Sequence, residues 1–273
     1  MESLILNPAD ADTGIEIIDL LTDPAFNSRR LHLHDTMIQM EALQRLANAF
    51  VESPDTILQE LVNAAVDLCG ADSAGISIEQ EDKTDEKYYL WVATAGSYSN
   101  FLNATLPRYP SACGVCIERG TPQLFRVTQR FFDIMKVEAP AVTDGILLPW
   151  QVEETRGTIW IVSHQKSVAF DGDDLRLMQT LANFAAMGVR QQRQQKILVE
   201  QAKATAAAAL ANELAHNINN PLQSVTNLLY LAREDKDHRE ASSLAHELTE
   251  PVQRLSSLVQ EILALPIGKL RSE

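Results

Sequence analysis

The chain has 273 residues, of which 45% are apolar and 22% are charged, and its formal net charge is −14 at neutral pH. This length and composition are those of a globular protein with about two domains. The acidic balance argues against nucleic acid or an anionic membrane as the main partner, since both repel negative charge. The sequence has neither a signal-peptide pattern at its start nor a run of about 18 apolar residues, and we therefore expect a cytoplasmic protein.

The first part of the chain predicts a leader followed by two helices. Residues 1–30 are acidic and broken by prolines, and we expect a loose leader with one short helix near Ile15 to Leu21. Apolar residues recur at helical spacing from His34 to Val51, which predicts an amphipathic helix that packs on another surface. A second helix is predicted from Asp55 to about Leu68, because the following Gly70 is a typical residue to end it.

A mixed pattern of strands and short helices follows. Apolar residues alternate around Ile76 and Trp91, which predicts two strands joined as a hairpin by a charged turn. Further elements are expected at residues 123–127 (strand), 131–135 (helix), 145–150 (strand) and 158–163 (strand). The last two strands are the most apolar and should lie at the centre of the sheet. Another helix begins near Leu175, so the predicted fold class is α+β with an antiparallel sheet.

Several short motifs carry a family resemblance. They are Cys113-Gly114, the run Arg119 to Phe125, Gly157 to Trp160, and Phe170 with Asp173 to Met178. Together with the order of the elements, they resemble a GAF sensory domain over residues 31–190. The resemblance implies a pocket for a small molecule or a protein partner between the sheet and the long irregular insert, and it names no particular ligand. We expect an unidentified small-molecule ligand and no cofactor or metal.

The chain contains three cysteines, an odd number that does not suggest a disulfide framework. Cys113 and Cys116 form a single Cys-x-x-Cys pair, which is half of the ligand set of a structural zinc site, and no second pair completes it. The pair is either redox-active or a pair of buried, inert thiols, and we favour the second interpretation. His164, directly after a predicted strand, either faces a ligand or is a hydrogen-bonded structural residue, and we favour the second interpretation.

The last third of the chain predicts a long helix and a returning helix. The helical pattern continues from Leu175 to about Ala232, and such a helix is too long to be stable alone, so it needs a parallel partner. A charged turn is expected at Arg233 to Arg239, and apolar residues recur at helical spacing from Leu244 to Ile262. Two such hairpins would form a dimeric four-helix bundle, and we therefore expect a homodimer.

One stripe of the long helix is apolar and should form a packing seam. The stripe consists of Ala207, Ala211, Leu214, Ile218, Leu222, Val225 and Leu229. His216 falls on the opposite, exposed side of the helix, and Asn220, one turn later, falls on the same side as His216. A lone exposed histidine is most often an ordinary surface residue, but its neighbours here form a motif.

The sequence from His216 to Leu222 reads His-x-x-x-Asn-Pro-Leu and follows Glu213-Leu214-Ala215. It resembles the phosphoacceptor box of the dimerisation domain of bacterial sensor histidine kinases, over residues 191–268. The resemblance implies that His216 is phosphorylated and that Asn220 orients the water that dephosphorylates a response regulator. The family carries an acid directly after the histidine as the base for autophosphorylation. Here that residue is Asn217, whose amide cannot act as a base near neutral pH.

Two functional hypotheses follow from these resemblances. In the first, a sensory domain controls a hairpin on which His216 takes part in phosphotransfer with a response regulator or a partner kinase, or in regulator dephosphorylation. In the second, a non-catalytic GAF module binds a ligand or a protein and is dimerised by a degenerate hairpin. The chain carries no Walker or Gly-x-Gly-x-x-Gly segment, and we expect no autonomous ATP-dependent kinase activity. A further reading is that the sequence is a fragment of a longer kinase.

The expected organisation has four parts. They are an acidic leader at residues 1–30, the GAF-like sensory domain at 31–190, the dimerisation and phosphoacceptor-like hairpin at 191–268, and a tail at 269–273.

Overall fold

The computed structural model describes residues 13–31, 36–81, 87–234 and 241–264. The start of the expected leader, most of the expected hairpin turn and the tail lie outside these residues. The chain divides into two compact units, Met1–Gln195 and Lys196–Glu273, which we call the sheet domain and the helical hairpin.

The sheet domain is built on a seven-stranded antiparallel sheet with the strand order β1-β5-β6-β7-β2-β3-β4. The strands are β1 (Ile15–Asp19), β2 (Ser73–Glu81), β3 (Lys87–Gly96), β4 (Thr105–Pro107), β5 (Gln123–Val127), β6 (Val142–Val152) and β7 (Thr155–Ser163). The two most apolar strands, β6 and β7, lie inside the sheet as predicted. The sheet together with its helices confirms the α+β fold class.

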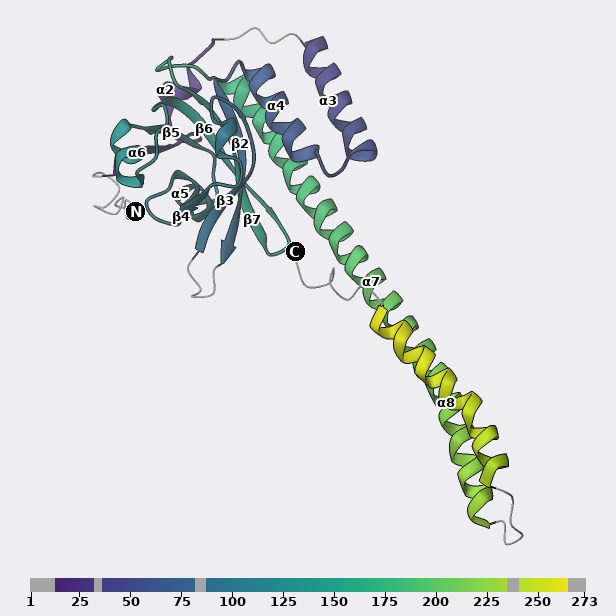
Figure 1. Cartoon of the computed structure of the whole chain (residues 1–273). Helices are drawn as coiled ribbons and strands as arrows, with labels where there is room; N and C mark the ends of the chain where they lie inside the picture. Colours follow the sequence, from purple (N-terminus) through teal and green to yellow (C-terminus); the bar gives the residue numbers. More distant parts are fainter. Residues whose placement is uncertain (1–12, 32–35, 82–86, 235–240, 265–273) are drawn as a thin grey trace. The chain divides into compact units, whose positions relative to one another are not determined.

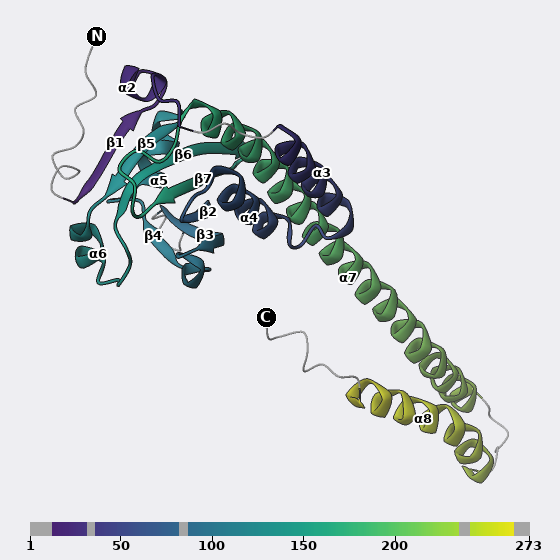
Figure 2. The ribbon, with the colours of Figure 1, turned by 90° about the horizontal axis from the view of Figure 1, so that it is seen from above.

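Helices lie on both faces of this sheet (Figures 1 and 2). The helical elements of the domain are α2 (Pro24–Asn27), α3 (Thr36–Glu52), α4 (Ile57–Cys69), the 3-10 helix η1 (Ser99–Phe101), α5 (Ala112–Arg119), α6 (Gln129–Met135) and the first part of α7 (Gly172–Glu234). Helix α4 ends where the sequence predicts, because Gly70 adopts the left-handed conformation at φ 59° and its N–H bonds to the carbonyl of Val66.

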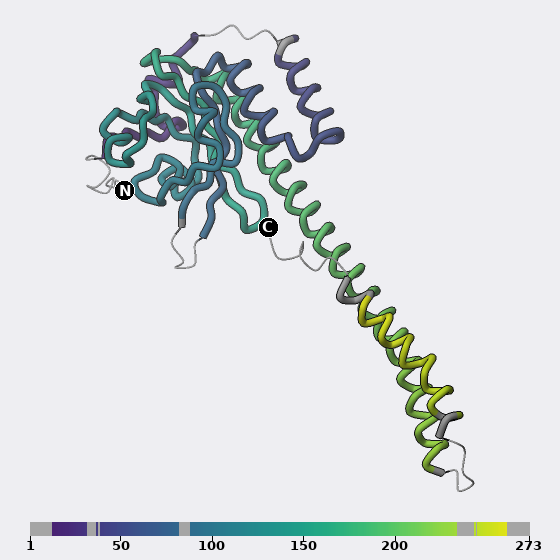
Figure 3. The backbone as a smooth tube through the Cα atoms, viewed as in Figure 1, coloured from purple at the N-terminus to yellow at the C-terminus, as the bar shows by residue number. Residues whose placement is uncertain are grey.

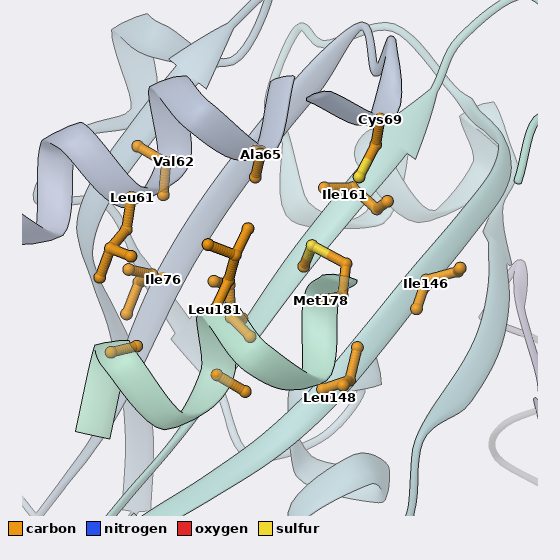
Figure 4. Close-up of a cluster of buried hydrophobic side chains, with 14 of the residues drawn as sticks. Leu61, Val62, Ala65, Cys69, Ile76, Ile146, Leu148, Ile161, Met178 and Leu181 are labelled. Atoms are coloured by element: carbon orange, nitrogen blue, oxygen red, sulfur yellow. The ribbon is translucent and has the colours of Figure 1, made fainter. Parts of the chain in front are cut away.

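The alternation of side chains along the strands produces two separate cores. On β7, Ile159 and Ile161 face α4 and α7, whereas Trp160 and Val162 face α5 and α6. Figure 4 shows the first core, in which Leu61 of α4 and Leu181 of α7 meet residues of β2, β6 and β7. Burial of each such aliphatic side chain contributes about 1.5–3 kcal/mol, so this face holds α4 and α7 on the sheet.

The segment from Ile15 to Leu21 is not a helix, and this expectation was wrong. Ile15 and Ile17 are buried while Glu16 and Ile18 are exposed, which is the two-residue period of a strand. Strand β1 pairs with β5 and extends the sheet at that edge. The tertiary hydrogen bonds of a sheet edge, which a local pattern does not contain, therefore decided its structure.

A buried ion pair joins the segment after α2 to the rest of the sheet domain. The guanidinium of Arg29 contacts the carboxylate of Asp144 at 2.9 Å, and their side chains are 10% and 0% exposed. The same Asp144 carboxylate accepts hydrogen bonds from the backbone N–H groups of Ala169 and Phe170, just before α7. Arg29 therefore links three segments that are far apart in the sequence.

The helical hairpin consists of the end of α7 and the returning α8 (Ala241–Ala264), traced in Figure 3. Helix α7 has 63 residues, and the predicted continuity from Leu175 to Ala232 is confirmed. The less exposed residues recur at helical spacing on both helices; they are Leu214, Asn217, Ile218, Pro221, Val225, Leu228 and Ala232 on α7, and Leu248, Pro251, Leu255 and Leu258 on α8. No helix in the described ranges is both long and apolar enough to cross a membrane.

The predicted apolar stripe of α7 is only partly covered. Leu214, Ile218 and Val225 lie on the side that faces α8, but Leu222 and Leu229 are 44% and 52% exposed. Proline at 221 takes the buried position instead. The line of contact between the two helices is therefore rotated relative to the predicted stripe, and four of the seven stripe residues stay exposed within one hairpin.

Candidate functional site

A cavity of about 110 Å³ lies on the α5 and α6 side of the sheet. Side chains from β1, β3, β5, β6 and β7 form one wall, and residues of α5, α6 and the segment between β3 and β4 form the others. Of the residues that line it, Thr105 and Val137 are exposed, so the cavity opens between the segments that carry them. This position agrees with the pocket expected between the sheet and the irregular insert.

Aromatic side chains form much of the cavity wall. The ring centroids of Trp91 and Trp160 are 4.9 Å apart, and the ring of Tyr98 lies 6.0 Å from Trp91 and 5.9 Å from Trp160. Phe101 and Phe132 meet the Tyr98 ring edge-on at 5.4 and 6.4 Å. These separations and tilts are those of favourable aromatic pairs.

Two glycines in the sheet make room for this arrangement. A Cβ atom at Gly75 would lie 2.2 Å from Cζ2 of Trp160, and a Cβ atom at Gly145 would lie 2.6 Å from Cε1 of Phe125. The indole of Trp160 therefore lies across β2, and there it meets Trp91 of β3. Glycine is needed at these positions for close approach, although their backbone conformation is ordinary.

Some polar groups around the cavity have hydrogen-bond partners within the protein, and others have none among the described residues. The Tyr98 hydroxyl donates to the carbonyl of Pro140 at 2.6 Å, and burial raises the pKa of this hydroxyl. His164 contacts the Ser73 hydroxyl at 2.9 Å and the Ala141 carbonyl at 2.8 Å, which confirms its structural interpretation. In contrast, the Nε1 atoms of Trp91 and Trp160 are buried without a hydrogen-bond acceptor among the described residues.

Cys113 and Cys116 are buried and form no disulfide, which agrees with the favoured interpretation of inert thiols. Cys113 lines the cavity and accepts a hydrogen bond from the Thr158 hydroxyl at 3.3 Å. Burial raises the pKa of both thiols, so the reactive thiolate is scarce at neutral pH. No group of residues able to hold a metal occurs in the ranges that the structure covers.

His216 and Asn220 lie on one exposed face of α7, as the helical period predicts. The amide nitrogen of Asn220 is 3.4 Å from Nδ1 of His216. In this orientation the amide donates, which makes Nδ1 the acceptor and leaves the ring proton on Nε2. Rotation of the amide by about 180° would bring its oxygen to Nδ1, move the ring proton there and free Nε2 as a nucleophile.

Asn217 does not share the exposed face of His216 and is directed toward α8. It is half-buried, and together with Asn220 it lines a groove of about 430 Å³ whose other side carries Glu247, Glu250 and Arg254. His216 does not line this groove. The structure thus brings two of the three candidate residues, His216 and Asn220, into contact and turns the third toward the hairpin seam.

The aromatic residues of the cavity were not singled out from the sequence. Trp91 and Trp160 read as ordinary strand residues, since alternation gives only the face of the sheet. The glycines at 75 and 145, each inside a strand, were the available signal, because glycine in a strand often marks the close approach of another group.

Comparison with known proteins supports one of the two resemblances. A family model described as the GAF domain matches residues 51–190, slightly more than half of the chain. Strand β1 and helices α2 and α3 lie outside this match, except for the last residues of α3. No curated protein matches the chain.

Solved structures to which the chain is similar include the following three. The GAF domain of a phosphoenolpyruvate-protein phosphotransferase from Coxiella burnetii is 17% identical at a TM-score of 0.47, covering 59% of this chain and 98% of that one. The GAF domain of a putative sensor histidine kinase from Pseudomonas syringae pv. tomato is 18% identical at a TM-score of 0.40, covering 60% and 94%. A free methionine-R-sulfoxide reductase from Neisseria meningitidis is 14% identical at a TM-score of 0.46, covering 62% and 98%.

The family match and the antiparallel sheet with its helices agree on the identity of the sheet domain. The match stops at residue 190, before the helical hairpin, so it concerns the sheet domain alone. The chain belongs to the GAF domain family.

Proposed function

We propose that this protein is a two-component signalling protein in which His216 exchanges phosphate with a response regulator or a partner kinase. The observation that carries the proposal is the pairing of an exposed histidine with an exposed amide one helical turn later, at 3.4 Å. Exposure of both side chains supports it, because a phosphorylated aspartate on another protein must reach them. The Asn-Pro-Leu sequence that follows supports it as well.

Phosphotransfer at this site needs the imidazole tautomer with a free Nε2. Nε2 attacks the phosphorus of an aspartyl phosphate, the bond from phosphorus to the aspartyl oxygen breaks, and the aspartate leaves as a carboxylate. The proton on Nδ1 stays on the ring and donates to the amide oxygen of Asn220. Asn220 acts here as a positioning residue, since it selects the tautomer and does not accept the proton.

Hydrolysis of the regulator's aspartyl phosphate is the alternative reaction at the exposed face of α7 that carries His216 and Asn220. The amide of Asn220 can both donate and accept a hydrogen bond, and can therefore orient a water molecule against the phosphorus of the docked aspartyl phosphate. The water adds its oxygen to phosphorus, the bond to the aspartyl oxygen breaks, and inorganic phosphate and aspartate form. This route does not require His216 as a nucleophile. Asn217 occupies the position at which sensor histidine kinases carry an acid, and an amide cannot act as the base for autophosphorylation. It therefore favours phosphotransfer from a regulator, or hydrolysis of the aspartyl phosphate, over autophosphorylation.

The two routes are separated by single substitutions tested on a phosphorylated response regulator. His216→Ala should abolish the acid-labile label on this protein while hydrolysis continues, and Asn220→Ala should slow hydrolysis by about 10²-fold. His246→Ala and Asn219→Ala remove an exposed histidine and an exposed amide outside the pair and serve as controls. Unchanged transfer and hydrolysis in both His216→Ala and Asn220→Ala would contradict the proposal.

We further propose that the hairpin functions as a homodimer that forms a four-helix bundle. The exposed apolar side chains of the hairpin support this, because Leu222 and Leu229 on α7 and Val252 and Val259 on α8 are 44–52% exposed within one hairpin. A second copy would offer an equivalent apolar surface to cover them. Helix α7 belongs to both units and would connect the sheet domain to the phosphoacceptor face.

The second candidate function is that of a non-catalytic ligand-binding module. The observation that favours it is the apolar, aromatic cavity of the GAF domain. In this case the hairpin serves only for dimerisation, and His216 and Asn220 are surface residues. Replacement of both residues together would then leave every response to ligand unchanged, whereas the first proposal expects loss of phosphate exchange.

A further inference from the structure

The chemistry of the cavity in the sheet domain restricts what it can bind. We propose that it takes a small, uncharged molecule with one aromatic ring and one hydrogen-bond acceptor, such as an aryl ketone. This inference rests on the second candidate function, in which the cavity is a ligand site. It adds the class of ligand, which the fold by itself does not name.

Size and polarity of the walls exclude ions and large ligands. A cavity of about 110 Å³ is smaller than the apolar protein cavities of about 150 Å³ that hold benzene, so it admits no more than a single ring with a small substituent. None of the described residues that line it carries a charge. An ionised ligand would lose its hydration there without gaining a partner of opposite charge, which is strongly unfavourable.

The shape of the wall favours an aromatic ring over an aliphatic group. Trp91, Tyr98 and Trp160 contact one another at tilts of 30–71°, and all three line the cavity. A planar ring placed among them can form further offset or edge-on pairs with these side chains. Gly75 supports the arrangement, because any side chain there would displace Trp160.

The third requirement is that the ligand carries a hydrogen-bond acceptor, because two indole N–H groups at the cavity have no acceptor within the part of the protein that the structure describes. The Nε1 atoms of Trp91 and Trp160 are buried without an acceptor among the described residues, although a buried indole N–H usually has one. The hydroxyl of Tyr98 is already satisfied by the carbonyl of Pro140 and makes no such demand. A carbonyl oxygen on the ligand would accept from one of the two indoles and remove the cost of an unmade hydrogen bond.

Three probes of nearly equal size and shape separate these requirements. Acetophenone has the ring and the carbonyl, α-methylstyrene replaces the carbonyl oxygen by a methylene group, and benzoate carries a charge. Calorimetric titration of the whole chain should give tightest binding for acetophenone, about tenfold weaker binding for α-methylstyrene, and no binding for benzoate. Each probe is titrated without any phosphate donor, so the result is independent of whether His216 exchanges phosphate.

Substitution of the indoles locates the hydrogen bond. Trp160→Phe and Trp91→Phe each keep a ring, and at least one of them should abolish the preference for acetophenone over α-methylstyrene. Trp150→Phe is the matched control, because Trp150 also has a buried, unpaired Nε1 but belongs to the core on the other face of the sheet. If the variants do not fold, as judged by circular dichroism, the three probes on the unmodified chain still decide.

Each other outcome overturns a stated part of the inference. Equal affinity for acetophenone and α-methylstyrene would refute the acceptor requirement. Binding of benzoate alone would leave the cavity a ligand site and refute the ligand class. Absence of binding for all three probes would refute both the class and the use of the cavity as a ligand site, and leave the phosphotransfer proposal untouched.

Discussion

The sheet domain buries many large aliphatic side chains completely, whereas the described part of the helical hairpin buries none of them completely. In the sheet domain, large aliphatic side chains such as Ile76, Ile146 and Leu181 are fully buried. In the hairpin, Leu229 and Val252 are each 52% exposed. A sheet with helices on both faces can enclose a core within one chain, whereas two helices alone provide a single line of contact. The difference teaches that the first unit encloses a core of its own, whereas the second leaves apolar side chains half exposed when it is considered alone.

Among the described residues, the most deeply buried ion pair lies in the sheet domain, which also carries exposed pairs such as Arg190 with Glu153. Arg29 and Asp144 in the sheet domain form a nearly fully buried pair. In the hairpin, Lys203 and Glu200 form an ion pair in which both side chains are 63% exposed. Contacts of the first kind are part of a closed interior, while those of the second kind compete with water.

The largest expected effect comes from breaking the buried pair. Arg29→Ala leaves the Asp144 carboxylate buried without its counter-charge and should lower the free energy of unfolding by about 3–5 kcal/mol. Lys203→Ala, which removes one partner of the exposed pair, should lower it by about 0–1 kcal/mol. Denaturant unfolding followed by circular dichroism measures both. Similar losses for the two variants would contradict this difference between buried and exposed pairs.

Two leucines on the same helix allow the stability contributed by buried and by half-exposed apolar side chains to be compared directly. Leu181 and Leu229 both belong to α7, but the first is 0% exposed and the second 52%. Leu181→Ala should cost about 2–5 kcal/mol because it leaves a cavity, and Leu229→Ala about 0.5 kcal/mol at high dilution. If Leu229→Ala becomes more costly as protein concentration rises, an intermolecular contact covers this residue.

Association of the hairpins is tested by a charge placed on each side of α7. Leu214→Asp should dissociate or unfold the bundle, because Leu214 lies on the covered side, whereas His216→Asp on the exposed side should be tolerated. Light scattering as a function of concentration measures the mass of each variant. A dilution-stable monomer for the unmodified chain would exclude the proposed homodimer.

The smallest effect concerns acid sensitivity in the sheet domain. Burial by itself raises the pKa of the Asp72 carboxyl. The carboxylate, however, accepts hydrogen bonds from the backbone N–H of His164 at 2.7 Å and from the Ser163 hydroxyl at 2.8 Å, and these outweigh burial and hold the pKa below its ordinary value of 3.8. The carboxylate therefore contributes stability above that ordinary value, and this contribution is lost as pH falls through the lower native pKa.

Asp72→Asn should accordingly make the acid loss of stability shallower between about pH 5 and pH 3, since an amide does not titrate. Asp67→Asn, which removes an exposed carboxyl from α4, is the control and should keep the slope of the unmodified chain. Melting temperatures across this pH range provide the measurement. An unchanged slope in Asp72→Asn would show that its hydrogen bonds do not favour the charged form.

Much of the secondary structure was determined by local sequence pattern. The strand at residues 123–127 and the helix running through Leu175 and Ala232 were predicted because the apolar period and the end signals of an element lie within a few residues of one another. The same period places His216 and Asn220 on one face of α7. Residues 15–19 were an exception, because a short segment at a sheet edge takes its structure from the strand beside it, and the short elements α2, β4 and α5 were not predicted.

Only the tertiary structure decided the cavity and the coverage of the hairpin. Trp160 and Trp91 meet across a strand at Gly75, and no local pattern specifies which side chains of separate strands come together. The apolar stripe of α7 was predicted from the sequence. Which of its residues α8 covers, however, depends on the rotation of one helix relative to the other. Periodicity gives the direction of a side chain from its own backbone, whereas burial depends on the surface that arrives opposite it.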